Sequence, residues 1–445
     1  MATEADTSAG ISGANDGDIV RLHFVKMHGL GNDFVMITDD ALGALVAPFA
    51  ASKAVSAKNG LSALNGPALK QFCAALARLV CDRHGGIGGD GLIVAINLTG
   101  LKVQAERSAP GSYLRALDEM TAAYPERELC DIAWLYVNSD GSYSAMCGNG
   151  LRCLTAFVLD LGWISYVRAA SHGFKIATAV YPVTVSTEGT TAGDASPSSP
   201  NFADDADAVN TIDTTDSAAK VALQVVTRLA GPQFAPVDIP LALDQLPHED
   251  TAGSVVTFID QTIRVRGQSL QVSCVSMGNP HCVVFEQSAC DVAAGMQAYA
   301  KDIQRAHGQG FSLQKFPASL IALAEDIQRL PLFPEGTNVE FVRVEGPDRA
   351  LVFVVERGCG PTLACASGAA AVLAAGVKTK RINKKSYVIL PGGKLEASLS
   401  VVREQEYIEL TGPAVQVFTG DFVLPANFVG FDADFSADFK RDVSL

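Results

Sequence analysis

The chain has 445 residues, of which 48% are hydrophobic and 18% are charged, and its formal net charge is −14. This length and composition are typical of a soluble globular protein with two domains. The negative charge argues against a nucleic-acid backbone or an anionic membrane as the partner, so a small molecule is the better expectation.

The N-terminal residues 1–19 are small, acidic and without periodicity, which predicts a disordered extension. They show neither the basic start nor the apolar run of a secretory or transit signal. The apolar stretches Leu154–Ile164 and Gly368–Val377 are too short to span a bilayer. We therefore expect a cytoplasmic protein whose ten cysteines are mostly free thiols.

The first half of the chain alternates strand and helix patterns around two glycine-rich turns. In chain order we predict a strand at Val20–Lys26, a turn at His28–Asn32, a strand at Phe34–Ile37, a helix at Gly66–Cys81, a glycine-rich loop at Arg83–Gly91, a strand at Leu92–Ile96, a helix at Leu151–Leu161 and strands within Phe174–Ser186. The segment 187–220 is rich in Thr, Ser, Ala, Asp and Gly, so it predicts a low-complexity insertion or linker.

The second half is again rich in strands and has one late helix. We predict strands at Val221–Leu229, Val255–Arg266, Val272–Ser276, Cys282–Phe285, Val339–Val344 and Leu351–Val355, then a helix at Gly368–Val377. Strands with occasional long helices in both halves indicate an α+β fold with two similar domains.

A hidden repeat relates the two halves. Each half has, in order, a Gly-Asn turn, a second asparagine, and a Cys-x-[Asn/Ser]-Gly motif that opens a helix. These features are Gly31-Asn32, Asn138 and Cys147-Gly148-Asn149-Gly150 in the first half, and Gly278-Asn279, Asn338 and Cys365-Ala366-Ser367-Gly368 in the second. Single Gly-Asn pairs are common turns, but three features in the same order predict two pseudo-symmetric domains whose equivalent loops face one cleft.

The chemistry is expected at Cys147 and Cys365, because both precede a predicted helix. Unpaired N–H groups and the macrodipole at a helix start stabilise a thiolate, which predicts a lowered thiol pKa. Two such thiols, one ionised and one protonated, form the acid/base pair that inverts a carbon acid. The same N–H groups could hold the carboxylate of the substrate.

Two other interpretations of the cysteines compete with this one. Buried structural cysteines are common, although a matched pair at two helix starts favours chemistry. A zinc site made of Cys147, Cys153, Cys359 and Cys365 is disfavoured, because the members of each pair are six residues apart and not in a CxxC pattern.

A set of motifs in the same order resembles the diaminopimelate epimerase family. The motifs are Lys26–Phe34, Asp82–Gly91, Asn138–Gly141, Met146–Cys153, Ser276–Cys282, Gly336–Phe341, Glu356–Gly358 and Thr362–Ala369. The resemblance covers residues from about 22 to 425 and implies two barrel-like sheets, each around a central helix that starts at a catalytic cysteine. It also implies interconversion of LL- and meso-diaminopimelate in lysine biosynthesis, with neither pyridoxal phosphate nor a metal.

The resemblance also assigns a substrate pocket. It places the backbone of Gly148 and Ala366 with Asn149 and Ser367 at the reacting carboxylate. The remaining pocket residues that it implies are Asn32, Asn138, Asn279, Asn338, Glu356 and Arg357. Arginine and asparagine suit the second amino-acid end of this substrate, because they can bind its carboxylate and ammonium groups. For His84 and His281 we favour a structural role.

The chain departs from the family pattern at two positions near Cys365. Ala366 replaces a glycine and Pro361 replaces a glutamate. Extra segments are expected around Ala41–Leu64, Asn97–Arg127 and Glu286–Phe333, besides the linker at 187–220. We expect domains at 20–186, completed by 412–425, and at 221–411, and the family implies a homodimer.

Three alternatives remain open. The proline and hydroxyproline racemases share the fold and the cysteine pair, but their substrate has one amino-acid end and does not require the distal set. A binding protein that has lost turnover is suggested only by Ala366 and Pro361. Oxidation of two facing thiols could also switch the activity off.

Overall fold

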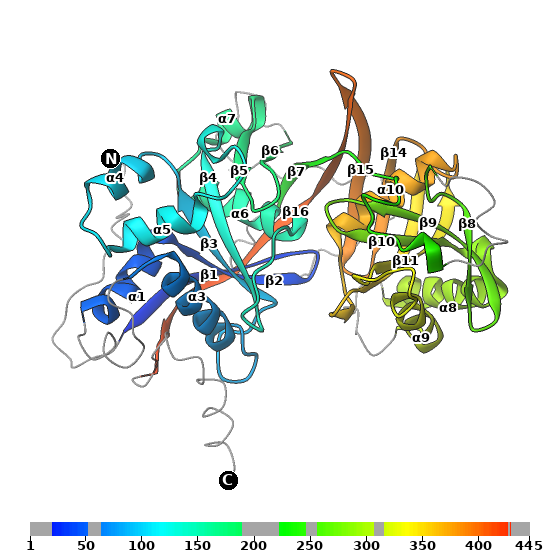
Figure 1. Ribbon diagram of the computed structural model, residues 1–445, viewed down its shortest axis with the longest axis horizontal. Helices are drawn as coiled ribbons and strands as arrows, with labels where there is room; N and C mark the ends of the chain where they lie inside the picture. Colours follow the sequence, from blue (N-terminus) through cyan, green and yellow to red (C-terminus); the bar gives the residue numbers. More distant parts are fainter. Residues whose placement is uncertain are drawn as a thin grey trace, which may run out of the picture.

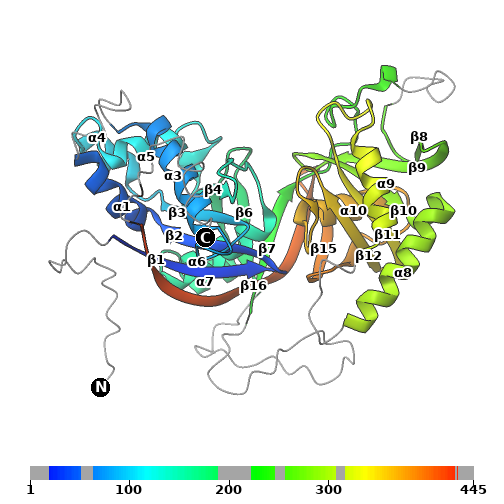
Figure 2. The same cartoon turned by 90° about the horizontal axis from the view of Figure 1, so that it is seen from below.

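The computed structural model describes residues 20–51, 64–188, 222–245, 256–306, 316–425 and 428. The predicted extension 1–19 and nearly all of the predicted linker 187–220 lie outside these residues. The chain forms two lobes that are joined by long strands (Figures 1 and 2).

The first lobe is a closed barrel of eight strands around one helix. Its strands follow the order of the chain, and β16 closes the ring by pairing with both β7 and β1. They are β1 (Arg21–Gly29), β2 (Asn32–Thr38), β3 (Gly91–Asn97), β4 (Ile132–Asn138), β5 (Phe174–Ala177), β6 (Val183–Thr187), β7 (Leu223–Ala230) and β16 (Gln405–Val423). The enclosed helix is α6 (Gly148–Asp160), whose Leu151, Leu154 and Phe157 pack against the strands.

Further helices cover the outer face of this barrel. These are α1 (Asp39–Ala51), α3 (Gly66–Val80), α4 (Leu101–Arg107) and α5 (Tyr113–Thr121), with α7 (Tyr166–Ser171) beside β6 and the short turn η1 (Arg127–Leu129). Because β3 lies between α6 and the outer helices, its residues from Gly91 to Ile96 are all buried. The strand therefore reads as a continuous apolar run and not as an alternating one.

The second lobe repeats this design around α10 (Ala366–Lys378). Its strands are β8 (Gln261–Val265), β9 (Gln268–Ser276), β10 (Pro280–Phe285), β11 (Asn338–Gly346), β12 (Arg349–Glu356), β13 (Gly360–Pro361), β14 (Lys385–Leu390) and β15 (Gly393–Val402), followed by β16. A bridge between Gln233 and Ser276 links the segment after β7 to β9. The outer face carries α8 (Cys290–Ala306), α9 (Ala318–Gln328) and the turns η2 (Leu243–Gln245) and η3 (Glu286–Ser288).

The strand directions give the internal repeat a structural form. From β1 to β7 the successive pairings are antiparallel, parallel, antiparallel, parallel, antiparallel and antiparallel. The series from β9 through β10, β11, β12, β14 and β15 to β16 has the same succession. The central helix follows the fourth strand in both series. The predicted α+β fold of two pseudo-symmetric barrel-like sheets around central helices is confirmed.

Several predicted elements differ from the structure at their ends. The helix expected at Leu151–Leu161 starts three residues earlier, at Gly148. Of the strand expected over 255–266, the described residues 256–266 form a strand only at Gln261–Val265. The extra segments 97–127 and 286–333 contain α4, α5, α8 and α9, which the periodicity did not indicate.

Candidate active site

Cys147 is the N-cap residue of α6. Its backbone is extended, with φ −153° and ψ 109°, and its Sγ accepts a hydrogen bond from the N–H of Gly150 at 3.4 Å. A thiol there takes the place of the usual serine or aspartate cap. The thiol in turn donates to Oδ1 of Asn32 at 3.7 Å, so it lies between a helix start and a side-chain amide.

Cys365 occupies the equivalent position in the second barrel, as the N-cap of α10. Its Sγ accepts from the N–H of Gly368 at 3.3 Å and lies 3.5 Å from Oγ of Ser367. The thiol also makes a hydrogen bond with the carboxylate of Glu356, which accepts from Oγ1 of Thr362 at 2.5 Å. The second thiol therefore faces a carboxylate where the first faces an amide.

The two helix starts meet at the interface between the barrels. A Cβ added to Gly148 would lie only 2.5 Å from Cβ of Ala366. Nδ2 of Asn149 donates across the interface to the carbonyl of Ala364 at 3.0 Å. Both predicted cysteine motifs therefore come together in one place, with Gly148 next to Ala366.

Burial dominates the proton affinity of both thiols in this closed arrangement. It raises the pKa of Cys147 to about 11, against the opposing effect of the N–H of Gly150. Burial also raises the pKa of Cys365 well above the usual range, and the nearby Glu356 and Glu340 carboxylates add to the rise. The lowered thiol pKa expected from the helix starts is therefore wrong for the closed site, because desolvation of the thiolate outweighs the helix N–H groups.

The turn at Asn32 belongs to β2 and is held by a charged network. Lys26 is a buried lysine whose Nζ lies 2.7 Å from Oδ2 of Asp33. Arg83 reaches Asp33 and Asp90 from the glycine-rich loop, with Nη2 distances of 2.7 and 2.8 Å. Hydrogen bonds from Arg83 and Lys26 lower the pKa of Asp33 to about 2, although burial acts in the opposite direction.

The corresponding turn at Asn279 is held by a buried histidine–glutamate pair. Nδ1 of His281 lies 2.7 Å from Oε1 of Glu340, with both side chains fully buried, and Nε2 lies 3.0 Å from Oδ1 of Asn279. His281 therefore sets the position of a predicted substrate residue. His84, by contrast, lies at an exposed loop where its backbone N–H donates to Asp82.

The other predicted pocket residues already have partners within the protein. Asn338 is buried, with Nδ2 donating to the carbonyl of Pro280 and Oδ1 accepting from the N–H of Arg357. The exposed guanidinium of Arg357 donates to the carbonyl of Glu335 at 2.6 Å. Asn138, at the end of β4, donates to Oγ of Ser142 at 2.9 Å.

Two residues near the cysteines were missed by the sequence analysis. Arg152 is completely buried, and its Nη2 donates to Oδ1 of Asn149 at 2.6 Å, which fixes the amide that crosses the interface. Burial lowers the pKa of this guanidinium. Thr362 holds Glu356 next to Cys365. The sequence could have pointed to both residues through their positions inside the cysteine-containing motifs, because no hydrophobic or helical pattern marks them.

The two departures from the family pattern fit this geometry. Ala366 opens α10 without a positive φ, so glycine is not required there, and its methyl group packs towards Gly148, which has no side chain. Pro361 pairs with Val355 in the short strand β13, and the adjacent Thr362 hydroxyl reaches Glu356. Neither change opens a gap between the thiol and its neighbours.

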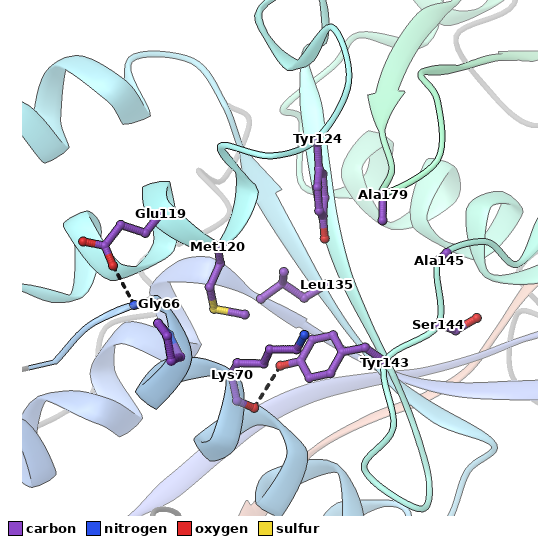
Figure 3. Close-up of a pocket in the computed structure, with 11 residues that line it drawn as sticks. Gly66, Lys70, Glu119, Met120, Tyr124, Leu135, Tyr143, Ser144, Ala145 and Ala179 are labelled. Carbon is purple, nitrogen blue, oxygen red and sulfur yellow. Dashed lines mark hydrogen bonds between the residues drawn. The ribbon is translucent and has the colours of Figure 1, made fainter. Parts of the chain in front are cut away.

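A separate hollow of about 440 Å³ lies on the first lobe between α3, α5 and the 143–145 loop (Figure 3). It contains neither cysteine and none of the predicted substrate residues. Its charged groups are engaged locally: Nζ of Lys70 lies 4.7 Å from the ring centroid of Tyr143, and Glu119 accepts from the N–H of Gly66. We therefore place the chemistry at the interface between the barrels and not in this hollow.

Two findings concern metals and membranes. Within the described ranges, no group of three or more His, Cys, Asp or Glu side chains is arranged to hold a metal ion. In the same part of the chain, no helix has both the length and the apolar character needed to cross a membrane.

The comparisons with known proteins identify the family. The sequence model for diaminopimelate epimerase matches residues 24–176 and 310–417. Diaminopimelate epimerase 1 of Nostoc sp. is 32% identical to this chain over 399 residues, which cover 90% of this chain and 99% of the relative. The chain belongs to the diaminopimelate epimerase family. It is therefore an isomerase.

Other relatives agree with this membership. The diaminopimelate epimerase of Heliobacterium modesticaldum is 29% identical over 404 residues, covering 91% of this chain and all of the relative. Among solved structures, a methylitaconate-delta-isomerase has a TM-score of 0.51 at 12% identity and covers 92% of this chain and 96% of its own. At that identity the likeness concerns the fold alone.

Proposed function

We propose that this isomerase interconverts LL- and meso-diaminopimelate, a reaction of lysine biosynthesis, by proton transfer at the α carbon between Cys147 and Cys365. The observation that carries the proposal is the meeting of two N-cap cysteines, one from each barrel, at a single interface. One thiolate removes the proton from one face of the carbon, and the opposite thiol donates a proton to the other face. No cofactor is needed, because each thiol ends the turnover in the state in which the other began.

The raised thiol pKa values suggest when the base forms. A thiolate is easier to form while the barrels are apart and water solvates the charge. Closure then desolvates the sulfur, and a desolvated thiolate is a stronger base towards a weakly acidic carbon. We propose that one thiol ionises before closure and that the substrate is held between the helix starts when they come together.

The pocket assignment rests on the resemblance to the family and is supported at the reacting carboxylate by the two helix starts. The first N–H groups of α6 and α10, at Gly148, Asn149, Ala366 and Ser367, would bind the carboxylate beside the reacting carbon and stabilise the carbanion. We propose that the distal amino-acid end is bound by Asn32, Asn138, Asn279, Asn338, Glu356 and Arg357. Several of these side chains, Arg357 above all, would exchange a present protein partner for the substrate.

We also propose the domain boundaries of the enzyme and its location in the cell. The domains would be residues 20–186 with 412–425, and residues 221–411, which is supported by the pairing of the last part of β16 with β1. A cytoplasmic location is supported by the ten cysteines, all of which are free thiols.

The decisive experiment follows isotope exchange. Purified, reduced protein is incubated with LL-diaminopimelate in deuterated water, and deuterium entry and meso-isomer formation are measured for the wild type, Cys147→Ala and Cys365→Ala. Because each thiol serves as base or acid, we expect each variant to lose about 100-fold or more of the epimerisation rate. Cys290→Ala, which changes an exposed cysteine on α8, is the matched control and should keep the wild-type rate.

The alternatives give different results in the same experiment. Exchange with proline and none with diaminopimelate would indicate a proline racemase-like enzyme. Binding without exchange for every amino acid tried would indicate a relative that has lost turnover. Epimerisation that survives in both cysteine variants would contradict the two-thiol mechanism.

We propose that the enzyme is a homodimer that associates along β16. Val417 and Phe418, at an irregularity in the pairing of β16 with β1, are 52% and 46% exposed, and exposed apolar side chains next to each other are typical of an interface. Val417→Asp should convert a dimer to a monomer in size-exclusion chromatography with light scattering. Val167→Asp, at a 70% exposed valine on α7, should leave the mass unchanged. A wild-type monomer would end this proposal.

A further inference from the structure

The carboxylate of Asp90 makes three hydrogen bonds just behind the candidate site. Its Oδ2 accepts from Nδ2 of Asn32 at 2.6 Å and from the N–H of Asp33 at 3.1 Å, and its Oδ1 accepts from Nη2 of Arg83 at 2.8 Å. Its backbone is also fixed, because its N–H donates to the carbonyl of Asp33 and its carbonyl accepts from the N–H of Ser139. The carboxylate therefore has a defined position relative to the Asn32 side chain.

A side-chain amide has one donating end and one accepting end, whereas a carboxylate only accepts. The bond to Asp90 therefore fixes which way the Asn32 amide points: Nδ2 turns to Asp90, and Oδ1 turns to the active site. There Oδ1 accepts from Nδ2 of Asn149 at 3.2 Å and from the Cys147 thiol at 3.7 Å. The Asn149 amide agrees with this choice, because its own Oδ1 is occupied by Arg152.

We propose that Asp90 is a positioning residue for the epimerase reaction, which holds the Asn32 amide with its carbonyl oxygen towards Cys147. The proposal rests on the role proposed above for Cys147. An acceptor facing the sulfur favours the protonated thiol, whereas a flipped amide would direct an N–H at the sulfur and favour the thiolate. Asp90 thus biases Cys147 towards the acid state without touching it.

Other groups also act on this thiol and would be unchanged by a flip. Glu356 approaches from the second barrel and raises the pKa of Cys147, and Arg152 on its own helix lowers it. Tyr136 on β4 and the buried Cys153 are further titratable groups near the sulfur. All of them remain in place, but Asp90→Asn also removes a carboxylate charge. The part of the shift that reports on Asn32 is therefore the part that is absent when Asp90→Asn is made in an Asn32→Ala background.

The test measures the alkylation rate of Cys147 by iodoacetamide against pH, with Cys365→Ala present throughout so that one thiol is followed by peptide mass spectrometry. In Asp90→Asn, the amide introduced at position 90 can donate as well as accept, so only Asn149 still holds the Asn32 amide in its present orientation, and the flipped amide, with its N–H towards the sulfur, becomes more populated. We expect alkylation below the thiol pKa to become about tenfold faster, which corresponds to a fall of about one pKa unit. Asp131→Asn removes an aspartate that pairs with Arg168 on the same lobe, away from the site, and should have no effect.

A second variant should shift the rate in the opposite direction. In Asn32→Asp/Asp90→Asn, the donor and acceptor exchange places and the net charge is kept, so the network can still form. The carboxylate introduced at position 32 can only accept from the thiol, so alkylation of Cys147 should be slower than in the parent. Faster alkylation in this variant would overturn the proposal even if Asp90→Asn alone does not fold.

The outcomes separate the proposals. Faster alkylation in Asp90→Asn that is lost in the Asn32→Ala background supports the positioning role, whereas an equal shift in both backgrounds, or no shift, overturns it and leaves Asp90 as a loop-holding residue. Loss of epimerisation in Cys147→Ala is measured independently. If that loss is absent, the proposed role of Cys147 fails, whatever the alkylation profiles show.

Discussion

The first barrel places an amide beside its cysteine, and the second places a carboxylate there. The backbones are equivalent: both thiols cap a central helix and accept from an N–H three residues later. The neighbours differ, with Asn32 next to Cys147 and Glu356 next to Cys365. The repeated fold therefore fixes where the thiols lie, while unrepeated side chains set how strongly each holds its proton.

The central helices show the same division. In α10, ten of the thirteen residues are buried and eight of those are alanine or glycine, because the helix runs inside its barrel with little room for side chains. In α6, twelve of thirteen residues are buried, and these include Arg152 and Phe157. The larger side chains of α6 include the arginine that fixes Asn149 at the interface. Among the described residues, α6 supplies an amide, Asn149, that crosses to the second barrel, whereas α10 has Ser367 at the equivalent position.

The contact between the helix starts offers the largest expected effect. Gly148→Ala would bring two Cβ atoms to 2.5 Å, closer than such atoms approach in proteins, and both belong to short, fixed side chains. The barrels would have to stay further apart, and a misplacement of about 1 Å can reduce a rate by about 100-fold. We expect kcat/KM for diaminopimelate to fall by that order.

A partner substitution checks the cause of this loss. Ala366→Gly removes the opposing methyl group, so the double variant Gly148→Ala/Ala366→Gly should recover most of the lost rate. The single variant Ala366→Gly measures how much that methyl group alone contributes to kcat/KM. Equal losses in Gly148→Ala and in the double variant would show that the overlap is not the cause.

The next largest effect is expected from the charged groups that hold the Asn32 turn. Asp33 forms ion pairs with Lys26 and Arg83 next to Asn32. These interactions lower the pKa of Asp33 to about 2, although burial acts in the opposite direction. A depressed pKa means that Asp33 stabilises the fold above its unfolded pKa of about 4 and loses this contribution as the pH falls towards 2. The shift corresponds to about 2 kcal/mol.

Asp33→Asn should therefore lower the free energy of unfolding by about 2 kcal/mol at neutral pH and flatten its dependence on pH between about 4 and 2. Chemical denaturation at a series of pH values measures both effects. Asp131→Asn, which breaks a more exposed pair with Arg168, should cost less than about 1 kcal/mol. If the free energy of unfolding of Asp33→Asn equals that of the wild type at every pH, this account is wrong.

The sequence predicted the repeat and the fold class because the features that carry them are local. Gly-Asn turns and Cys-x-x-Gly helix starts are visible in short windows, and α3 begins at the predicted Gly66 with a proline at its start. The first residues of α6 and α10 were harder to predict from the sequence. Gly148 and Ala366 are the first helical residues because the cysteine before each of them is the N-cap.

The proton affinities of the thiols could not be predicted from the sequence. A helix start argues for a lower thiol pKa, and only the assembled interface shows that desolvation raises the pKa of both thiols and that Glu356 adds a nearby charge. Arg152 was similarly invisible, since its partner Asn149 is fixed by a contact with Ala364 in the other barrel. Pairings between residues 215 positions apart have no signature in any short window.

The smallest expected effect tests the carboxylate that distinguishes the second thiol from the first. Burial is the main cause of the raised pKa of Cys365, and Glu356 is the next. Glu356→Gln gives Cys365 a neutral amide neighbour, as Cys147 has in Asn32. We expect the pKa of Cys365 to fall by about one unit, so that its alkylation below that pKa becomes about tenfold faster in a Cys147→Ala background. Glu335→Gln makes the same chemical change at an exposed position of the second lobe and should leave the profile unchanged, since only the backbone carbonyl of Glu335 binds Arg357. If Glu356→Gln leaves the titration of Cys365 in place, burial alone sets the affinity of that thiol, and the difference between the two barrels must then arise on the side of Asn32.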